Sequence, residues 1–181
     1  MISINDFDIF KNNQCSLQET SKDTSGEKPQ YMTTCTKRVV NFDNVKTKLL
    51  NSFGESEEHA KSVDALVIDK DIIYFIEFKN GDVKLEKRFI PIKARDSILI
   101  FNHITNNSIK FNREKCIFIL VYNEDKNTFD TKTQIALARA DRSNVNYDIY
   151  DLAGMKGFCY KDVLTLNKKQ FDDQIISGNS W

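Results

Sequence analysis

The sequence predicts an α/β protein in which a mixed central β-sheet lies between layers of helices, as a three-layer sandwich. Segments rich in β-branched and aromatic residues alternate along the chain with segments whose apolar residues recur at helical spacing. Several strand-like segments are apolar on both faces, as are strands that helices cover on two sides. The chain has 181 residues, of which 40% are hydrophobic, and this suffices for one globular core without disulfide or metal staples.

The first forty residues give the weakest structural signal. Phe7 and Phe10 are able to dock on a core, but the stretch 11–30 is polar and typical of a loop. We therefore expect residues 1–40 to form an N-terminal arm or peripheral segment, and residues 41–181 to form a single α/β domain.

From residue 41 onward the elements are expected in a definite order. Asn41 is a suitable N-cap for a helix with apolar residues at helical spacing, and Gly54 ends that helix. Two strands follow, at 63–68 and 72–78, joined by a short polar turn. The later elements are a helix from Pro91 to Thr105, a strand at 115–122, a helix at 131–142, extended segments at 145–152 and 158–166, and a last short helix opened by a capping box of Asn167 and Gln170.

Composition argues against several classes of protein. No run approaches 18 consecutive apolar residues, so we expect no membrane span, and the N-terminus lacks the pattern of a signal peptide. The four cysteines are scattered without zinc-ligand spacing, and no glycine-rich phosphate loop follows a predicted strand. These features predict a cytoplasmic protein that is neither a zinc protein nor a Rossmann-type nucleotide-binding domain.

The distribution of charge is uneven, although the formal net charge is zero, with 26 basic and 26 acidic residues. Residues 42–78 include four basic and eight acidic side chains, whereas residues 79–115 include nine basic and four acidic ones. An acidic stretch that leads into a basic one suits a site that holds a cation beside a polyanion.

The strands at 63–68 and 72–78 bring three ionisable residues to one place. If the two strands form a hairpin that turns at Lys70-Asp71, Asp64 lies opposite Glu77, and Lys79 joins the same face. Opposed carboxylates repel each other, and a hard divalent cation such as Mg²⁺ relieves that repulsion. On this reasoning, Glu77→Gln would stabilise the metal-free protein slightly. Lys79 is placed to orient or deprotonate an attacking water molecule, or to hold a phosphate oxygen.

Asp64, followed by Glu77-Phe78-Lys79, resembles the motif of the PD-(D/E)XK nuclease superfamily, which has the restriction-endonuclease-like fold. In that motif an acid precedes or opens one core strand and Glu-x-Lys lies on the next strand; the usual proline is Val63 here. The resemblance implies an αβββαβ core and a catalytic set of Asp64, Glu77 and Lys79. It also implies a Mg²⁺ ion bound by both acids and the carbonyl of Phe78, with Mn²⁺ as a substitute. The implied activity is hydrolysis of nucleic acid, DNA more than RNA.

Weaker signals add candidates for contacts with a substrate. Lys93 and Arg95 lie on the helix after the second strand, and Gln134 and Arg139 lie on a later helix. Each is a candidate for a contact with substrate, although each is also an ordinary residue for a helix surface. Some members of the superfamily use a glutamate from the first helix, where this chain offers only Asp43.

Two functions from different classes therefore remain open. The first is a Mg²⁺-dependent nuclease, in a defence, mobile-element or repair setting. The second is a catalytically inactive protein of the same fold that binds a protein partner, as an immunity or inhibitory factor does; the absence of a net positive charge favours it. A structural explanation of the motif also stands, in which charged residues at strand ends only keep the surface solvated.

Overall fold

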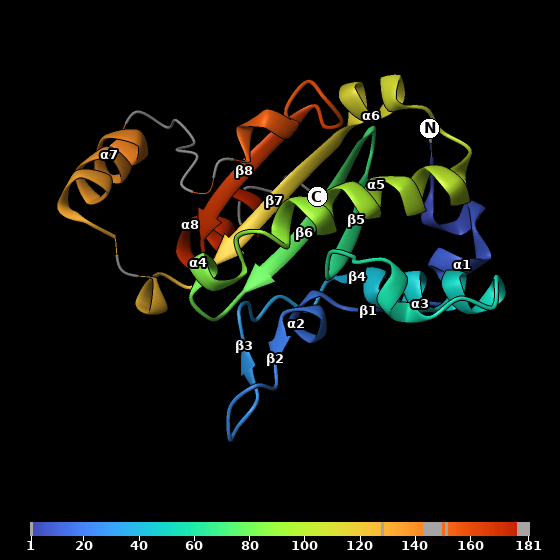
Figure 1. Ribbon diagram of the computed structural model, residues 1–181, viewed down its shortest axis with the longest axis horizontal. Helices are drawn as coiled ribbons and strands as arrows, with labels where there is room; N and C mark the ends of the chain where they lie inside the picture. The colour runs from blue at the N-terminus through green and yellow to red at the C-terminus, as the bar shows by residue number, and fades with distance from the viewer. Residues whose placement is uncertain (1, 128, 143–149, 151, 177–181) are drawn as a thin grey trace.

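The computed structural model describes residues 2–127, 129–142, 150 and 152–176, and it is centred on a six-stranded sheet with the order β1-β4-β5-β6-β7-β8 (Figure 1). Neighbouring strands from β1 to β6 are antiparallel, whereas β6, β7 and β8 are parallel, so the sheet is mixed, as predicted. Its strands are β1 (Gln14–Ser16), β4 (Arg38–Asn41), β5 (Ala65–Asp69), β6 (Ile72–Lys79), β7 (Cys116–Tyr122) and β8 (Asp162–Asn167).

Helices pack on both faces of this sheet, which confirms the predicted flanking of a mixed sheet by helices. One face carries α1 (Asp8–Lys11), α3 (Phe42–Ser52) and α5 (Ile90–Thr105), and α5 runs across the sheet in Figure 1. The other face carries α2 (Leu17–Thr20) and α8 (Lys168–Phe171). The remaining helical segments are η1 (Ile4–Asp6), η2 (Glu57–His59), α4 (Val83–Glu86), α6 (Ile109–Lys115), η3 (Glu124–Lys126), α7 (Thr131–Arg142), η4 (Ala153–Met155) and the π-helical η5 (Asp172–Ile176). Within the described part of the chain, no helix has both the length and the apolarity that crossing a membrane requires.

The N-terminal segment, described from residue 2, contributes a strand to the sheet and buried side chains to the core, whereas an N-terminal arm or peripheral segment was expected at 1–40. β1 pairs with β4, and Phe10 and Leu17 are fully buried. A separate two-stranded sheet, β2 (Lys22–Asp23) with β3 (Gln30–Tyr31), projects from the body (Figure 1). The segment is peripheral in two respects, because β1 is the edge strand and the β2–β3 hairpin projects from the body. The sequence gives little sign of this arrangement because strands this short are held by pairing with distant partners rather than by an apolar pattern of their own.

The helix that precedes the site begins and ends where the sequence predicts. The Asn41 side chain accepts a hydrogen bond from the Asn44 backbone N–H at 3.0 Å and so caps α3. The chain leaves the helix through Gly54, whose positive φ of 73° suits a residue without a side chain.

The hairpin of β5 and β6 has the predicted register. Ile68 pairs with Ile73 and Leu66 with Phe75, and the turn between the strands places Lys70 in a left-handed conformation with φ of 52°. Because successive side chains of a strand alternate between faces, this register fixes which residues share the face covered by α5.

Three features differ from the sequence-based expectations. In the predicted αβββαβ order a helix precedes three consecutive strands, whereas here α3 lies between β4 and β5. The extended segment expected at 158–166 is a strand only from Asp162 onward. Val63, expected on the face away from Glu77, packs in the same cluster as Phe75, because regular pairing in β5 starts two residues later. The segment expected to be extended at 145–152 lies largely outside the described residues.

Candidate functional site

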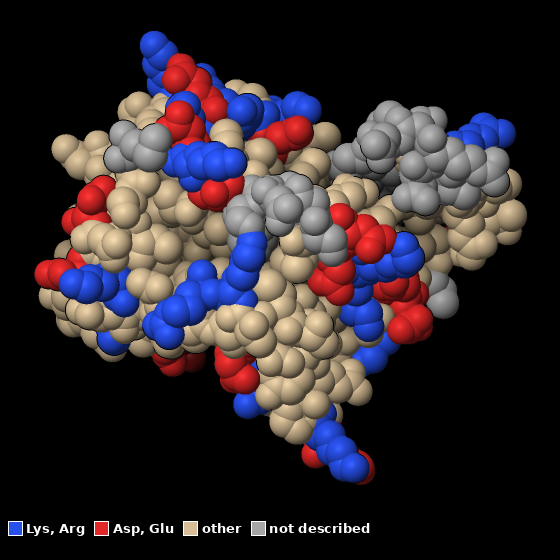
Figure 2. All heavy atoms as spheres, turned by 180° about the vertical axis from the view of Figure 1, so that it is seen from behind, with Lys and Arg blue, Asp and Glu red and all other residues tan. Residues whose placement is uncertain are grey.

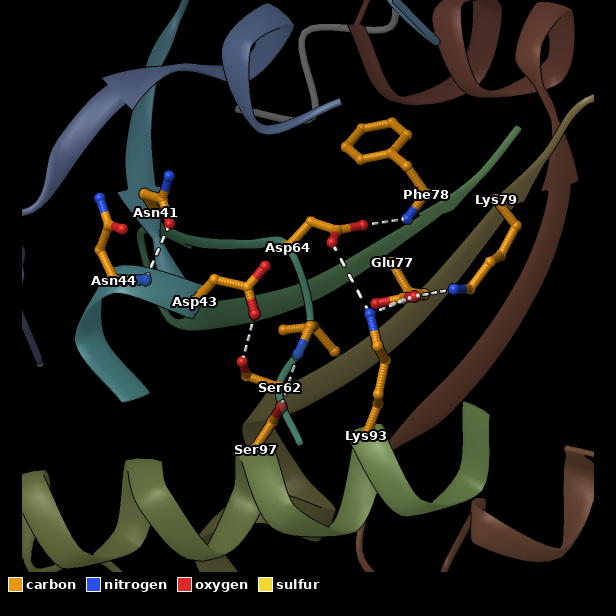
Figure 3. A network of polar contacts seen from close by, with 11 residues as sticks. Asn41, Asp43, Asn44, Ser62, Asp64, Glu77, Phe78, Lys79, Lys93 and Ser97 are labelled. Atoms are coloured by element: carbon orange, nitrogen blue, oxygen red, sulfur yellow. Dashed lines mark hydrogen bonds and ion pairs between the residues drawn. The ribbon is translucent and has the colours of Figure 1, made fainter. Parts of the chain in front are cut away.

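The hairpin brings Asp64 and Glu77 together, as the sequence predicts. Ala65 pairs with Ile76, so Asp64 and Glu77 stand opposite each other one step further along, and the Asp64 N–H donates to the Ile76 carbonyl at 3.1 Å. Figure 3 shows the two carboxyl groups on the same side of the hairpin, with Lys79 reaching back towards Glu77. The three residues of the predicted motif therefore form one cluster.

Glu77 is the most enclosed member of this cluster. Its side chain is 0% exposed, and Oε1 lies 2.7 Å from the Lys93 ammonium and 3.1 Å from the Lys79 ammonium. Oε2 is buried and has no hydrogen-bond partner among the residues that the structure describes. A buried carboxylate oxygen without a partner costs free energy, so it marks a position where a further ligand would be stabilising.

Asp64 is held by the backbone of the opposite strand. Its Oδ2 accepts a hydrogen bond from the Phe78 N–H at 2.6 Å, and its side chain is 17% exposed. Burial and the nearby Glu77 raise the pKa of Asp64 well above its ordinary value, and the positive charge of Lys93 only partly opposes them. For Phe78 the structure shows the amide engaged with Asp64; a role for its carbonyl as a metal ligand stays a prediction.

Lys93 is the residue whose place the sequence did not fix. It rises from the first turn of α5 between the two acids (Figure 3), with its ammonium 2.7 Å from Glu77 and 3.8 Å from Asp64 Oδ1. Burial lowers the pKa of Lys93, but the attraction of Asp64 and Glu77 outweighs it, so the pKa is raised overall. One sequence signal was available: the first turn of α5 contains no acidic residue, and a lysine there is opposed by the helix dipole unless another element supplies a carboxylate.

A second set of polar contacts holds the chain just before Asp64. The Ser62 hydroxyl donates to the carboxylate of Asp43 from α3, and the Val63 N–H donates to the Ser97 hydroxyl of α5 at 2.9 Å. Asp43, the one acid that the helix offered, therefore lies at the site, and its charge adds to the rise of the Asp64 pKa. These contacts fix Asp64 between two helices.

The structure does not bring the other predicted substrate contacts to this cluster. Arg95 is exposed on α5, and its charge acts on Cys159 rather than on the acids. Gln134 is exposed and donates to the Phe129 carbonyl, and Arg139 is exposed on the same helix. Figure 1 shows that helix, α7, standing apart from the sheet. Contacts of these three residues with a substrate stay predictions.

A pocket of about 230 Å³ opens beside Asp64 and Lys79. The segment around β2 supplies its other wall, with Ser21, Lys22 and Ser25. The N-terminal segment, which sequence reasoning left aside, is thus part of the surroundings of the site.

Asn80, directly after Lys79, fastens that wall to the sheet. Its side-chain N–H groups donate to Asp23 at 2.7 Å and to Gln30 at 2.8 Å, and its oxygen accepts from Asn123 at 2.8 Å. The hydrogen bond from Asn80 is the main reason that the pKa of Asp23 is lowered to about 2. Asn80, which the sequence places in a turn, therefore links the β2–β3 hairpin to the end of β6.

Charged side chains of both signs are interspersed on the face opposite to the view of Figure 1 (Figure 2). Among the described residues, this face shows no broad basic surface of the kind that binds a polyanion without regard to sequence.

The donor set fits a hard divalent cation. Mg²⁺ in proteins is commonly held by one or two carboxylates, with waters and substrate phosphates completing its shell, and Asp64 with the unpartnered oxygen of Glu77 matches that pattern. Across the part of the chain that the structure describes, no group of three or more His, Cys, Asp or Glu residues is arranged to hold a metal.

Comparison with protein-family models, with curated proteins and with solved structures gave no match.

Proposed function

We propose that this protein is a metal-dependent nuclease of the PD-(D/E)XK type, with DNA as its expected substrate and the cytoplasm as its expected compartment. The observation that carries the proposal is Glu77: a fully buried carboxylate with one unpartnered oxygen, opposite a second carboxylate and beside two ammonium groups. The run from β4 through β7 is offered as the equivalent of the restriction-endonuclease-like core, with α3 in an unusual place.

The roles proposed follow from the contacts. Asp64 and Glu77 would hold Mg²⁺ or Mn²⁺, and the ion would supply charge neutralisation and an acidified water molecule. The Phe78 amide keeps Asp64 oriented, since it donates to one of the two carboxylate oxygens. Lys79, 14% exposed and on the rim of the pocket, would hold a phosphate oxygen or the attacking water.

Cleavage assays test this function directly. Supercoiled, linear and single-stranded DNA, and RNA, are incubated with the protein in Mg²⁺, in Mn²⁺ and in EDTA. We expect cleavage that depends on the metal. The absence of cleavage on every substrate, at high protein concentration, would contradict the proposal.

Lys79→Ala is expected to lower the rate of cleavage by about 10²–10⁴-fold, as losses of general acid–base groups do. Its affinity for Mn²⁺, measured by calorimetry, should be unchanged or slightly higher, because a nearby positive charge is removed. Lys110→Ala, at an exposed lysine of α6, is the matched control and should cleave at the parent rate. Full activity of Lys79→Ala would remove Lys79 from the mechanism.

A second function has one observation in its favour. Lys79 and Lys93 already pair with Glu77, so the cluster is largely neutralised as it stands, which suits an inactive protein that binds a protein partner. On this alternative neither the parent nor any variant cleaves nucleic acid, and Mn²⁺ does not bind.

A further inference from the structure

A single ammonium group lies between the two carboxylates that the proposed function assigns to the cation. Lys93 Nζ is 2.7 Å from Glu77 Oε1 and 3.8 Å from Asp64 Oδ1, and the three side chains are 19%, 0% and 17% exposed, respectively. A carboxylate oxygen bound to Mg²⁺ lies at about 2.0–2.1 Å from the ion. A cation bound by both acids would therefore occupy the position of the Lys93 ammonium group and would supply positive charge in its place.

Lys93 is held there by charge rather than by its helix. The N-terminal end of a helix repels a positive side chain, and the first turn of α5 offers no acidic residue to offset this. The lysine side chain is a flexible four-carbon stem, so its ammonium can move to another acceptor without a change in the backbone. The Lys79 ammonium also lies 3.1 Å from Glu77, so Glu77 would retain one cationic neighbour if Lys93 moved away.

The charges at the site favour such a move once a cation arrives. Asp64, Glu77 and the neighbouring Asp43 supply up to three negative charges, against the positive charges of Lys79 and Lys93. A divalent cation added to this set leaves an excess of positive charge, which a phosphodiester group would offset.

We propose that Lys93 competes with the divalent cation for Asp64 and Glu77 and, once displaced, binds a phosphate of the nucleic acid. This inference rests on the proposed function and adds to it a coupling between cation binding and nucleic-acid binding. The cation binds weakly to the free protein and more tightly when nucleic acid is present, and by linkage nucleic acid binds more tightly when the cation is present.

Calorimetric titration with Mn²⁺ alone, on the parent, Lys93→Met and Lys93→Gln, tests the competition. Methionine keeps much of the apolar stem without the charge, and glutamine keeps a hydrogen-bond donor. Both variants are expected to bind Mn²⁺ about 5–100-fold more tightly than the parent, within the usual range of coupling between sites. Lys110→Met, which removes an exposed positive charge from α6, is the control and should bind Mn²⁺ as the parent does.

The second half of the proposal is tested by fluorescence anisotropy of a short labelled single-stranded DNA, in EDTA and in Mn²⁺. A Lys79→Ala background slows cleavage during the measurement. Mn²⁺ should tighten DNA binding in this background, and the further change Lys93→Met should remove most of that enhancement. An enhancement that persists without Lys93 would overturn the transfer of Lys93 to phosphate.

The outcomes separate this inference from the proposed function. Equal or weaker Mn²⁺ affinity of the Lys93 variants, together with metal-dependent cleavage by the parent, would overturn the competition and leave the nuclease intact. Absence of Mn²⁺ binding in parent and variants, with no cleavage, would overturn both. If a variant is too unstable for calorimetry, the rise of its melting temperature with Mn²⁺ concentration reports the same affinity, because a ligand that binds only the native state stabilises it by an amount set by the ratio of ligand concentration to Kd.

Discussion

Glu77→Gln is expected to destabilise the metal-free protein, which reverses the expectation from sequence alone. On the sequence, Glu77 was one of two opposed like charges, so its neutralisation would relieve repulsion. In the structure the same carboxylate accepts the Lys93 ammonium at 2.7 Å and lies 3.1 Å from the Lys79 ammonium. Removing the charge would leave two largely buried ammonium groups with a neutral neighbour.

The magnitude follows from two opposing effects. At an effective dielectric constant of about 20, each ammonium at these distances attracts the carboxylate by about 5–6 kcal/mol, and desolvation of the fully buried carboxylate offsets several kcal/mol of this. Loss of one partner from a buried pair costs about 3–5 kcal/mol. Since the lysine side chains are 14% and 19% exposed and glutamine keeps an acceptor oxygen, we expect a loss of about 2–3 kcal/mol.

Urea unfolding at pH 7 in EDTA, followed by circular dichroism, measures this change as a shift of the midpoint at unchanged slope. Glu57→Gln is the matched control: the exposed Glu57 side chain accepts a hydrogen bond from the Thr47 hydroxyl at 3.2 Å, and loss of its charge should change stability by no more than about 0.5 kcal/mol. A midpoint for Glu77→Gln equal to or above that of the parent would show that carboxylate repulsion outweighs the two ion pairs. The interpretation that Lys79 and Lys93 stabilise the buried charge of Glu77 would then be wrong.

Two further predictions concern the surroundings of Glu77. Burial, and then the nearby Glu77, raise the pKa of Asp64, so native Asp64 keeps a proton that the unfolded chain releases above about pH 4. The free energy of unfolding should therefore fall as pH rises from about 4 to the pKa of native Asp64. Asp64→Asn should flatten this dependence in unfolding experiments across pH. An unchanged profile for Asp64→Asn would assign the slope to another group. Asn80→Ala should let the pKa of Asp23 rise from about 2 towards 3.8, seen by NMR titration of the carboxyl group, because the main hydrogen bond that lowers it is lost. The same change should cost about 1–3 kcal/mol of stability through unsatisfied partners, and a pKa of Asp23 that stays near 2 would show that Asn80 does not hold the hairpin.

Local chemistry in the sequence was enough to place several elements and the heart of the site. The cap at Asn41, the capping box of Asn167 and Gln170, and the register of β5 with β6 all appear as predicted. Each depends on interactions between residues close together along the chain: a side chain with a backbone group three residues away, or two strands joined by a tight turn. The same register put Asp64 opposite Glu77 without any knowledge of the remaining fold.

Tertiary structure decided what surrounds that pair. Lys93 reaches the acids only because α5 packs across β6 with its first turn over Glu77, and helical spacing within α5 does not specify where that face meets the sheet. The N-terminal segment joins the sheet because β1 pairs with β4, more than twenty residues later along the chain. The Asn80 side chain forms hydrogen bonds with residues of β2 and β3 that are still further away in the sequence. Contacts between residues so far apart leave no periodic signal in either partner. The sequence alone therefore determined that the two carboxylates and Lys79 lie together. The packing of α5 placed the Lys93 charge that compensates the carboxylates, and the packing of the N-terminal segment formed the pocket beside them.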